Sequence, residues 1–431
     1  MIRIIVILSL GLTLCFSLNN AYCAGSGAYR LEVPDAEALG KGAAFVAQAD
    51  NPSAIYYNPA GLAQLKGKTY VSLGASVIQP FCSYEDTAGN QTDRRRQIFT
   101  IPNAFVVSDF GLDKFSFGLG ATSYWGLGTY WSEDSFSKYV ATKSDLSTQD
   151  VMFTAAYELN KNISVGVGVD YTKALVDKKK KLIQLGGGDG DFQLKGRDNN
   201  SWGYRLSTLY KLNKNHSFGL MYRSAMDLVY KGKVYLNDLN GAGLNYQATF
   251  GGTSYATDMS TKSKLPQSIL LGYCFKPDDK WRFEADMEWM DWSSVNKEQI
   301  DYPSETNIGR LNVLNAGNPV QRNWRAVLSY AFGTEYKVND NWKLRLGYFF
   351  HKTPIPEGTF DTALPDSTSN SLTLGTGYQI NKNLILDLAY AGMFFNPRKI
   401  NNAVGSSSGA SINGKYSTLI NVYLVTLTFK L

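Results

Sequence analysis

Few residues of this 431-residue chain have the types and the spacing that catalysis requires. Residues 405–409 (G-S-S-S-G) match the G-x-S-x-G pattern of serine hydrolases, but they lie in a Ser/Gly/Asn-rich stretch without the strand-to-helix turn that such a nucleophile needs. The histidines, His216 and His351, fall at opposite ends of predicted strands, so neither can act as the base for a serine. No H-E-x-x-H sequence and no metal-site spacing of Cys and His occurs. The sequence therefore predicts neither an enzyme nor a cofactor.

The first 23 residues have the pattern of a secretory leader. Arg3 precedes the apolar run 4–18, and the small-residue spacing that ends at Cys23 predicts cleavage before Ala24. A lipid-modified Cys23 is the alternative, which Tyr22 disfavours because a small residue usually stands there. We therefore expect an exported protein.

The composition after the leader is typical of a membrane β-barrel. No later apolar run approaches the ~18 residues of a membrane helix. The chain is rich in Gly (40), Tyr (27) and Phe (22), has a formal net charge of +6, and alternates apolar with polar residues in many segments. Strands in a barrel wall alternate in this way because one face meets lipid and the other meets the lumen.

About fourteen alternating segments have the length of tilted spanning strands. Their approximate spans are 69–80, 97–110, 114–124, 149–160, 163–176, 200–212, 216–231, 262–276, 281–293, 321–338, 342–351, 371–380, 384–395 and 416–431. Short connections alternate with long polar ones along the chain. Bacterial barrels have tight periplasmic turns and longer outer loops, whereas a soluble sandwich has no reason to sort its loops by side. We therefore predict an antiparallel transmembrane barrel with both termini in the periplasm.

A period of two assigns the side chains of each strand to lipid or lumen. In the predicted strand 321–338, this period places Trp324 on the lipid-facing side. The predicted lumenal residues include Arg205, Arg223, Asp170 and Asp387; Arg282, Glu284, Asp286 and Glu288; Arg325, Val327, Ser329 and Glu335; and Lys343, Arg345, Gly347, Phe349 and His351.

These lumenal charges have two interpretations. In the first, they pair with one another across neighbouring strands and tie the N-terminal segment to the wall, because charges away from water need partners. In the second, Arg325 or Arg345 holds the carboxylate of a ligand beside Phe349 and Val327, because a guanidinium presents a fixed fork of donors.

The segment Ala36–Leu62 precedes the first predicted strand and is rich in Ala and Gly. Pro52 and Pro59 remove backbone donors, and the segment closes with the sequence N-P-A-G at 58–61, so it cannot run through a sheet. Short side chains allow close backbone packing, and Asn side chains satisfy turn amides locally. We expect a compact plug in the lumen, which gives the domains 1–23 (leader), 24–68 (plug) and 69–431 (barrel).

Several motifs in this order resemble the FadL-type outer-membrane proteins, which carry long-chain fatty acids or other hydrophobic compounds across the outer membrane. The motifs are Ala38–Gly40, Gly42–Ala47, Asn51–Leu62, Glu288–Ser293, Leu344–Tyr348, Thr353–Pro356 and Leu364–Asp366. The resemblance covers nearly the whole mature chain. It implies that the plug is the family's hatch, that the lumen holds a hydrophobic ligand, and that the protein resides in the outer membrane without a cofactor.

The resemblance also implies roles for particular residues. The hatch and gating candidates are Asn51, Pro52, Asn58, Pro59, Ala60 and Gly61, and the ligand-binding candidates are Phe45, Arg325, Arg345, Phe349, Val327, Trp131 and Tyr130. Trp131 and Tyr130 belong to the predicted outer loop 126–148, where exposed aromatic residues indicate initial capture of an apolar ligand or packing on neighbouring loops. Gly118 and Gly120 in the third strand are candidates for a wall kink that opens to lipid, or they simply give room to the hatch.

The partners we expect are a hydrophobic small molecule and the lipids of the outer membrane. The basic stretches 94–96 and 178–181 are candidates for contact with lipopolysaccharide phosphates, or are solvated loops. We expect a monomer that does not bind nucleic acid. An aromatic hydrocarbon channel and an open aqueous porin are the alternative functions, and the plug disfavours the porin.

Overall fold

A computed structural model describes residues 27–31, 34–184, 188–240 and 246–431, and the structural statements below refer to these residues. The predicted leader lies outside them. No helix in the described ranges is long and apolar enough to cross a membrane.

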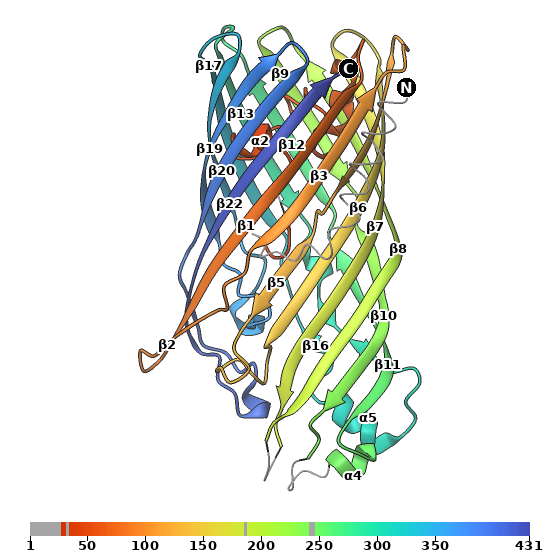
Figure 1. The fold of residues 1–431 in the computed structure, drawn as a ribbon, viewed down its shortest axis with the longest axis vertical. Coiled ribbons are helices and arrows are strands. Elements are labelled where there is room, and N and C mark those ends of the chain that lie inside the picture. Colours follow the sequence, from red (N-terminus) through yellow and green to blue (C-terminus); the bar gives the residue numbers. More distant parts are fainter. Residues whose placement is uncertain (1–26, 32–33, 185–187, 241–245) are drawn as a thin grey trace.

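The chain folds into a closed antiparallel barrel whose wall has 14 strands (Figure 1). Neighbours in sequence are neighbours in the wall, and β22 pairs with β1 from Tyr70↔Lys430 to Asp86↔Gly414, which closes the sheet. Closure satisfies backbone groups that lipid cannot hydrogen-bond. The predicted fold class and strand number are confirmed. The wall consists of β1 (Tyr70–Asp86), β3 (Phe99–Ser108), β4 (Phe115–Thr122) with β5 (Gly126–Tyr130), β6 (Lys143–Glu158), β7 (Ile163–Leu182), β8 (Gly190–Lys211), β9 (His216–Arg223) with β10 (Met226–Asn237), β11 (Tyr255–Leu265) with β12 (Ser268–Phe275), β13 (Trp281–Met290), β17 (Val327–Lys337), β18 (Trp342–His351), β19 (Ser369–Asn381), β20 (Leu384–Phe395) and β22 (Gly414–Lys430).

The two ends of the barrel differ. Short turns gather at the upper end in Figure 1, where the C-terminus lies, and long loops gather at the lower end. By the rule for bacterial barrels the short turns face the periplasm, so the predicted alternation of loop lengths is confirmed. The long loops carry β2 (Gln91–Asp93), α4 (Tyr246–Phe250), η2 (Trp292–Ser294), β14 (Lys297–Glu298), β15 (Ile300–Asp301), α5 (Ile308–Leu314), β16 (Val320–Gln321), η3 (Glu357–Thr359), β21 (Arg398–Ile400) and η4 (Ser406–Ser408).

Several strands extend further toward the long-loop end than the sequence predicts. The spans 163–176 and 200–212 correspond to β7 (Ile163–Leu182) and β8 (Gly190–Lys211), and the predicted loop 126–148 contains β5 and the start of β6. Beyond the membrane a strand has no lipid-facing side, so it needs no apolar alternation and period two does not reveal it.

The predicted faces hold inside the strands. Leu344 and Leu346 of β18 are 42% and 52% exposed toward lipid, whereas Arg345 between them is 5% exposed. The prediction is wrong at Trp324 and Arg325: Trp324 is buried and Arg325 is exposed. The reason is that β17 begins only at Val327, so the alternation does not apply before it.

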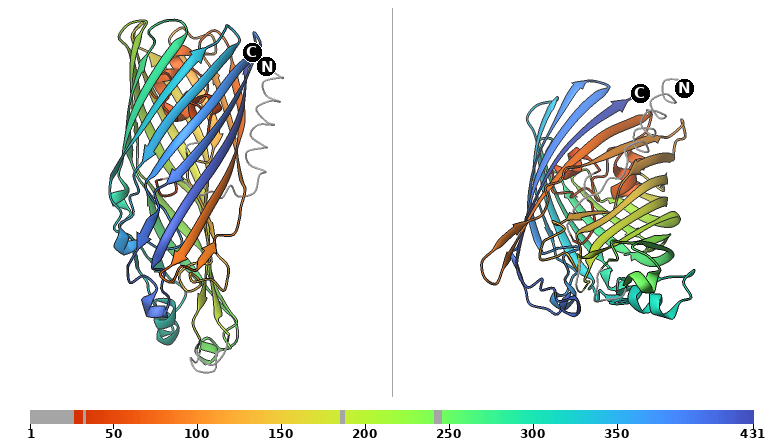
Figure 2. Two further views of the ribbon diagram at one scale, coloured as in Figure 1. Left: turned by 90° about the vertical axis from the view of Figure 1, so that its left-hand side faces the viewer. Right: turned by 60° about the horizontal axis from the view of Figure 1, so that its bottom comes forward.

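Residues 35–65 form the hatch, which lies inside the barrel near the short-turn end (Figure 2, left). It contains α2 (Ala36–Leu39), α3 (Ala54–Tyr57) and η1 (Pro59–Gln64). Asp35 caps α2 by accepting the Ala38 N–H at 2.9 Å, and Asn58 caps η1 by accepting the Ala60 N–H at 3.1 Å. Asp and Asn side chains thus satisfy the first amides of α2 and η1, as the sequence predicts.

Wall glycines provide the seat for this hatch. A Cβ on each of them would lie closer than 3 Å to a hatch atom, so only glycine permits the observed approach. These positions are Gly118, Gly166, Gly219, Gly272, Gly333, Gly347 and Gly375. The hatch is therefore seated by direct contact with the backbone of at least six wall strands.

Candidate ligand pathway in the lumen

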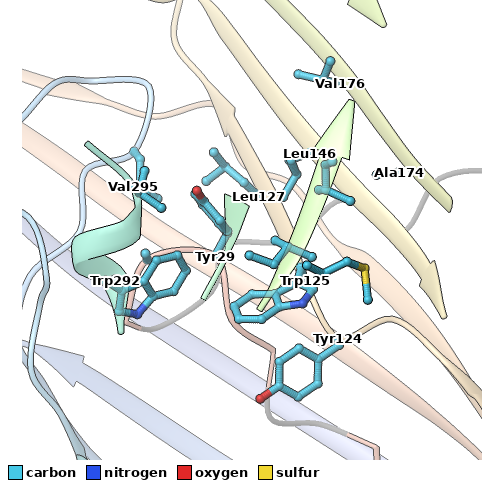
Figure 3. Close-up of a cluster of buried hydrophobic side chains, with 14 of the residues drawn as sticks. Tyr29, Tyr124, Trp125, Leu127, Leu146, Ala174, Val176, Trp292 and Val295 are labelled. Carbon is cyan, nitrogen blue, oxygen red and sulfur yellow. The ribbon is translucent and has the colours of Figure 1, made fainter. Parts of the chain in front are cut away.

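Five aromatic residues pack against one another between the hatch and the long loops, within a buried apolar cluster. We call Tyr29, Tyr124, Trp125, Trp292 and Trp324 the aromatic chamber. The Tyr29 ring centroid lies 5.0 Å from that of Trp292, and the ring centroids of Trp125 and Trp292 are 5.5 Å apart (Figure 3). The ring centroid of Trp324 lies 5.4 Å from that of Tyr29. Most of these pairs meet edge to face, which stabilises each by ~0.5–1.5 kcal/mol beyond burial. Such a site suits an apolar ligand.

Interrupted strands bring these rings together. Tyr124 and Trp125 follow β4, where the chain leaves the ladder for three residues before β5 begins. Trp292 lies in η2, directly after β13, and Trp324 lies just before β17. Four of the five rings thus come from residues that follow or precede a wall strand, and Tyr29 comes from the segment before the hatch.

The segment that precedes the hatch fills the chamber. The Leu31 N–H donates to the Tyr124 carbonyl at 2.9 Å, and the Gly126 N–H donates to the Tyr29 carbonyl at 2.8 Å. Between them, Arg30 forms an ion pair with Glu288 of β13. Burial raises the pKa of the Tyr29 phenol, which therefore stays neutral among the indoles.

Arg223 at the end of β9 lies where the chamber meets the hatch. Its guanidinium carbon is 4.0 Å from the ring centroid of Tyr124 and 5.3 Å from that of Tyr56. It donates to the Tyr56 carbonyl at 3.3 Å and lies 3.4 Å from the carboxylate of Asp170. Its Nε atom is buried and has no hydrogen-bond partner among the described residues. A small cavity beside it is lined by apolar residues, among them Trp125, Met226 and Leu265, and also by Asp150 and Asp170.

Buried ion pairs hold the hatch to the wall. Lys41 of the hatch donates to Glu284 of β13 at 2.6 Å, with both side chains almost fully buried. Arg345 of β18 donates to Glu335 at 2.8 Å and to Asp387 at 2.6 Å. Its third carboxylate is Glu37 of the hatch, 3.7 Å away. The lumenal charges thus pair with one another, as the first of the two interpretations holds.

The N-P-A-G motif is locked against β7 and β8. The Asn58 amide donates to the Val46 carbonyl at 2.7 Å. The Ala60 N–H donates to Ser207 at 2.9 Å, and Ser164 donates to the Ala60 carbonyl at 2.9 Å. Pro59 packs against Gly166, and Gly61 has no room for a Cβ because Ala49 lies beside it.

Asn51 and Pro52 lie in the hatch turn before α3. Asn51 donates to Glu37 at 3.0 Å and accepts the Ser53 N–H at 2.9 Å, and Pro52 is buried. These residues hold the hatch together, and a gating role for them stays a prediction.

The two arginines proposed as carboxylate ligands do not occupy a ligand site. Arg325 is exposed, and its backbone N–H donates to the Pro354 carbonyl at 3.0 Å. Arg345 is buried, but carboxylates of the protein already surround it. Arg223, which the sequence places among the lumenal arginines without a special role, takes the position beside the chamber.

The remaining lumenal candidates lie apart from one another. Phe45 packs within the hatch, its ring centroid 5.4 Å from that of Tyr57 and 4.7 Å below the Lys41 ammonium. Val327 belongs to the apolar cluster of the chamber. Phe349 belongs to a second cluster, with Leu31 and residues of β20 and β22. Phe45 and Val327 therefore lie in the cluster that contains the chamber rings, whereas Phe349 does not.

The predicted capture loop is packed rather than open. Trp131 is buried and its indole N–H donates to the Thr362 carbonyl at 2.9 Å. Tyr130 ends β5, and its carbonyl accepts the Arg95 N–H at 2.9 Å. Exposure of these aromatics was expected; instead, they join the neighbouring loops, which is the alternative that the sequence left open.

Ion pairs cross the long-loop mouth of the barrel. Glu298 of β14 pairs with Lys178 of β7 and with Arg322, which in turn donates to Asp361 at 2.5 Å. Burial alone would raise the pKa of Glu298, but Lys178 and Arg322 hold it well below its usual range. Lys178 is thus committed to a protein carboxylate, and contact with lipopolysaccharide stays a prediction.

The third wall strand is interrupted, but not at its glycines. Gly118 and Gly120 lie in regular β4, and both make room for Ile55 of the hatch. The break falls at residues 123–125. The residues of β3 that precede Ala104 have no ladder partner on the β4 side. Pro102, which lacks a donor, lies in this unpaired part of β3.

Sequence reasoning missed Tyr29 and Trp292 as parts of the site. Tyr29 stands alone in a segment without periodicity, so no pattern indicated it. Trp292 belongs to the 288–293 motif of the resemblance, which was the available signal. The missed assignments came from residues that lie outside regular strands.

Comparisons with known proteins agree with this geometry. Residues 20–431 match the model of a family described as outer membrane protein transport protein (OMPP1/FadL/TodX). The long-chain fatty acid transport protein of Escherichia coli K12 is 25% identical over 390 residues, which cover 82% of this chain and 84% of that protein. The crystal structure of a Pseudomonas aeruginosa FadL homologue shares the fold with a TM-score of 0.79 at 21% identity, over 93% of this chain and 99% of that one. The Pseudomonas putida toluene transporter TodX gives 0.70 at 18% identity, over 95% and 100%.

Proposed function

Because this chain belongs to the outer membrane protein transport protein family (OMPP1/FadL/TodX), we propose that it carries a hydrophobic compound across the bacterial outer membrane by passive diffusion, without catalysis. The observation that carries the proposal is the aromatic chamber above a seated hatch. The chamber offers apolar surface to a ligand, whereas the hatch fills the lumen that an open porin would need.

The ligand class that the site fits best is an amphiphile with a long apolar body and a carboxylate end, such as a long-chain fatty acid. Arg223 supplies a buried Nε donor that its protein neighbours leave unused, next to Trp125 and Met226. A charged hydrogen bond to a ligand carboxylate would satisfy that donor. The relative from Escherichia coli, described as a long-chain fatty acid transport protein, supports this class.

An uncharged aromatic hydrocarbon is the second candidate. The edge-to-face arrangement of Trp125, Trp292 and Tyr29 suits a flat ring as well as a chain. The fold shared with a toluene transporter supports it.

For release we propose two routes. In one the hatch shifts and the ligand continues to the periplasm. In the other the segment Tyr29–Leu31 leaves the gap between β3 and β4, and the ligand passes through the wall into lipid. The protein acts as a monomer in either case.

Quenching of tryptophan fluorescence tests the chamber and the ligand class together. The mature protein in non-ionic detergent is titrated with dibromostearate and, separately, with dibromobenzene. We expect saturable quenching by dibromostearate, and a loss of most of its amplitude when Trp125, Trp292 and Trp324 are all changed to Phe. Absence of saturable quenching by either probe would contradict the proposed function.

The matched variants Arg223→Gln and Arg325→Gln decide the ligand class. Removing the charged donor at Arg223 should weaken dibromostearate binding about tenfold, since hydrogen bonds to charged groups contribute ~1.5–3 kcal/mol, and should leave dibromobenzene binding unchanged. Arg325→Gln removes an exposed arginine and should change neither. Equal losses for both probes in Arg223→Gln would favour an uncharged ligand.

A further inference from the structure

Five lysines surround the lumen at its periplasmic mouth. Lys211, Lys276, Lys343 and Lys430 lie at strand ends, on positions that period two directs toward the lumen, and Lys68 lies in the link from the hatch to β1. We call this set the lysine ring. Lys343 confirms the inward direction, because its ammonium lies 3.1 Å from the lumenal carboxylate of Glu335.

The backbone that carries the ring is fixed in a repeated way. The N–H groups of Lys211, Lys276 and Lys430 donate to the carbonyls of Asn162, Asn215 and Asn383 in the adjacent turns, at 2.7, 2.8 and 2.8 Å. Those turns are themselves closed by asparagine side chains: Asn160, Asn213, Asn339 and Asn381 each accept the N–H two residues on, at 2.8–2.9 Å. The ring therefore stands on a rigid rim.

The ring has more positive charge than its surroundings neutralise. In the described part of the chain, Lys68, Lys211, Lys276 and Lys430 have no ion pair with a carboxylate. Lys276 acts electrostatically on Lys211, and Lys68 and Lys343 act on Lys430, so like charges lie close together. Asp50 of the hatch acts on both groups, Glu158 also acts on Lys211, and Glu37 also acts on Lys430. Each of these carboxylates already has a cation beside it: Arg282 at 3.4 Å from Asp50, Lys66 beside Glu158, and Arg345 at 3.7 Å from Glu37.

Lysines at the opposite mouth differ. Lys138, Lys143, Lys178 and Lys181 each form an ion pair with an aspartate or glutamate. Other outer lysines of the described residues, among them Lys195 and Lys399, also have no ion pair, so the ring is distinguished by its direction toward the lumen.

We propose that the lysine ring is an anion site that receives the carboxylate end of the transported amphiphile on the periplasmic side of the hatch. Ammonium groups on flexible stems suit a single carboxylate that arrives in more than one orientation. Lysines without ion pairs at the mouth also raise the local concentration of an anion. This inference rests on the proposed function for its ligand class.

An anionic phospholipid headgroup carries similar chemistry and is the other source of a negative charge. The inward direction of Lys211, Lys276 and Lys430 favours a ligand in the lumen, because bilayer lipids lie outside the wall.

Direct binding is tested by NMR on the mature protein in non-ionic detergent, with lysines carrying ¹³C-dimethyl labels that Lys→Arg variants assign. Hexanoate should shift the signals of Lys68, Lys211, Lys276 and Lys430 in a saturable way and leave those of the exposed Lys195 and Lys231 unchanged. A response of the ring to dihexanoyl phosphatidylglycerol but not to hexanoate would overturn the proposal, as would equal linear shifts of all lysines. This measurement does not depend on transport.

Transport supplies the second test. A variant with Lys68, Lys211, Lys276 and Lys430 changed to Gln is compared with a matched variant in which the exposed outer residues Lys195, Lys231, Lys262 and Lys399 are changed to Gln. In cells without another uptake route, the ring variant should take up oleate about fivefold more slowly. The reason is that positive charge at the mouth raises the local concentration of the oleate anion, and the variant lacks this charge. Its uptake of oleyl alcohol and its affinity for dibromostearate should not change.

The outcomes separate the two proposals. Uptake of both oleate and oleyl alcohol by the unmodified protein, with no effect of the ring variant on oleate, would overturn the lysine ring alone. Equal slowing of both compounds would also overturn it. Failure of the unmodified protein to take up either compound would contradict the proposed function, and the NMR titration would still decide whether the ring binds a carboxylate.

Discussion

The two halves of the lumen are built differently. In the half near the periplasm, hatch and wall meet backbone to backbone at glycines, and Lys41, Glu284 and Arg345 form buried ion pairs. In the other half, the segment from Tyr29 to Leu31 is held by a few hydrogen bonds, by ring contacts and by the ion pair between Arg30 and Glu288. Close-packed surfaces separate at a high cost, whereas aromatic side chains at strand ends reorient with less. The first movement on ligand entry is therefore expected in the chamber and not at the seat of the hatch.

Among the predicted changes, removal of one buried charge at the seat of the hatch should have the largest effect on stability. Lys41→Met leaves Glu284 buried without its partner, so we expect a loss of ~3–5 kcal/mol in the free energy of unfolding. The double variant Lys41→Met/Glu284→Leu should recover most of it, because no buried charge is left over. Guanidinium unfolding in detergent measures both. Equal losses in the single and the double variant would show that the pair does not hold the hatch.

A side chain introduced at one of the wall glycines that contact the hatch should have the second largest effect on stability. Gly347→Val places carbon atoms against Lys41 and Gly42 of the hatch, and overpacking of this kind costs ~1–3 kcal/mol. Hydrogen exchange of the hatch amides should rise accordingly. Gly358→Val is the matched control, because a Cβ there has no described heavy atom within 4 Å. A similar rise in both variants would contradict the idea of a glycine seat.

The same contrast explains what the sequence predicted. Leu344 and Arg345 follow period two because the wall has one apolar and one polar environment, so strand number and faces were readable. Trp324 and Arg325 precede the strand, where no such constraint acts. The glycine at position 166 indicates that another backbone approaches the strand closely there. The sequence does not show that this backbone is that of Ala60, because the contact forms only when the barrel closes around the hatch.

The pairings of the lumenal charges were equally hidden. A sequence shows that Arg345 faces inward but not that Glu335 stands beside it, since that contact follows from the β17–β18 register. Likewise, the chamber draws Tyr29, Trp292 and Trp324 from three irregular segments. Residues outside periodic elements are positioned by the tertiary structure alone, which local patterns do not contain.

In the chamber, loss of a ring should affect the ligand more than the fold. Trp292→Ala removes the indole between Tyr29 and Trp324, and we expect dibromostearate affinity to fall about thirtyfold, or ~2 kcal/mol. Exchange of the hatch amides should stay close to that of the unmodified protein. If hatch exchange rose as much as in Gly347→Val, the two halves would be one cooperative unit and the proposed order of movements would be wrong.

The smallest expected effect is a pH dependence of the segment that fills the chamber. Asp366 in the loop after β18 accepts the Thr353 hydroxyl at 2.6 Å and the Ala28 N–H at 3.3 Å, and burial raises its pKa from 3.8 to about 6. Because the docked state holds the proton more tightly than the undocked one, docking is most stable below pH 4 and weakens as the pH rises to about 6.

Hydrogen exchange at Leu31 and Gly126, corrected for the intrinsic rate, should therefore be about twentyfold faster at pH 7 than at pH 4.5, a change of ~2 kcal/mol. Asp366→Asn keeps an oxygen acceptor but does not titrate, so its corrected rates should be the same at both pH values. Hatch amides such as that of Ala60 provide the internal control, since Ser207 rather than a carboxylate accepts their hydrogen bond. An unchanged pH response in Asp366→Asn would mean that another group governs the docking of Tyr29, and that the chamber segment does not depend on the protonation of this loop.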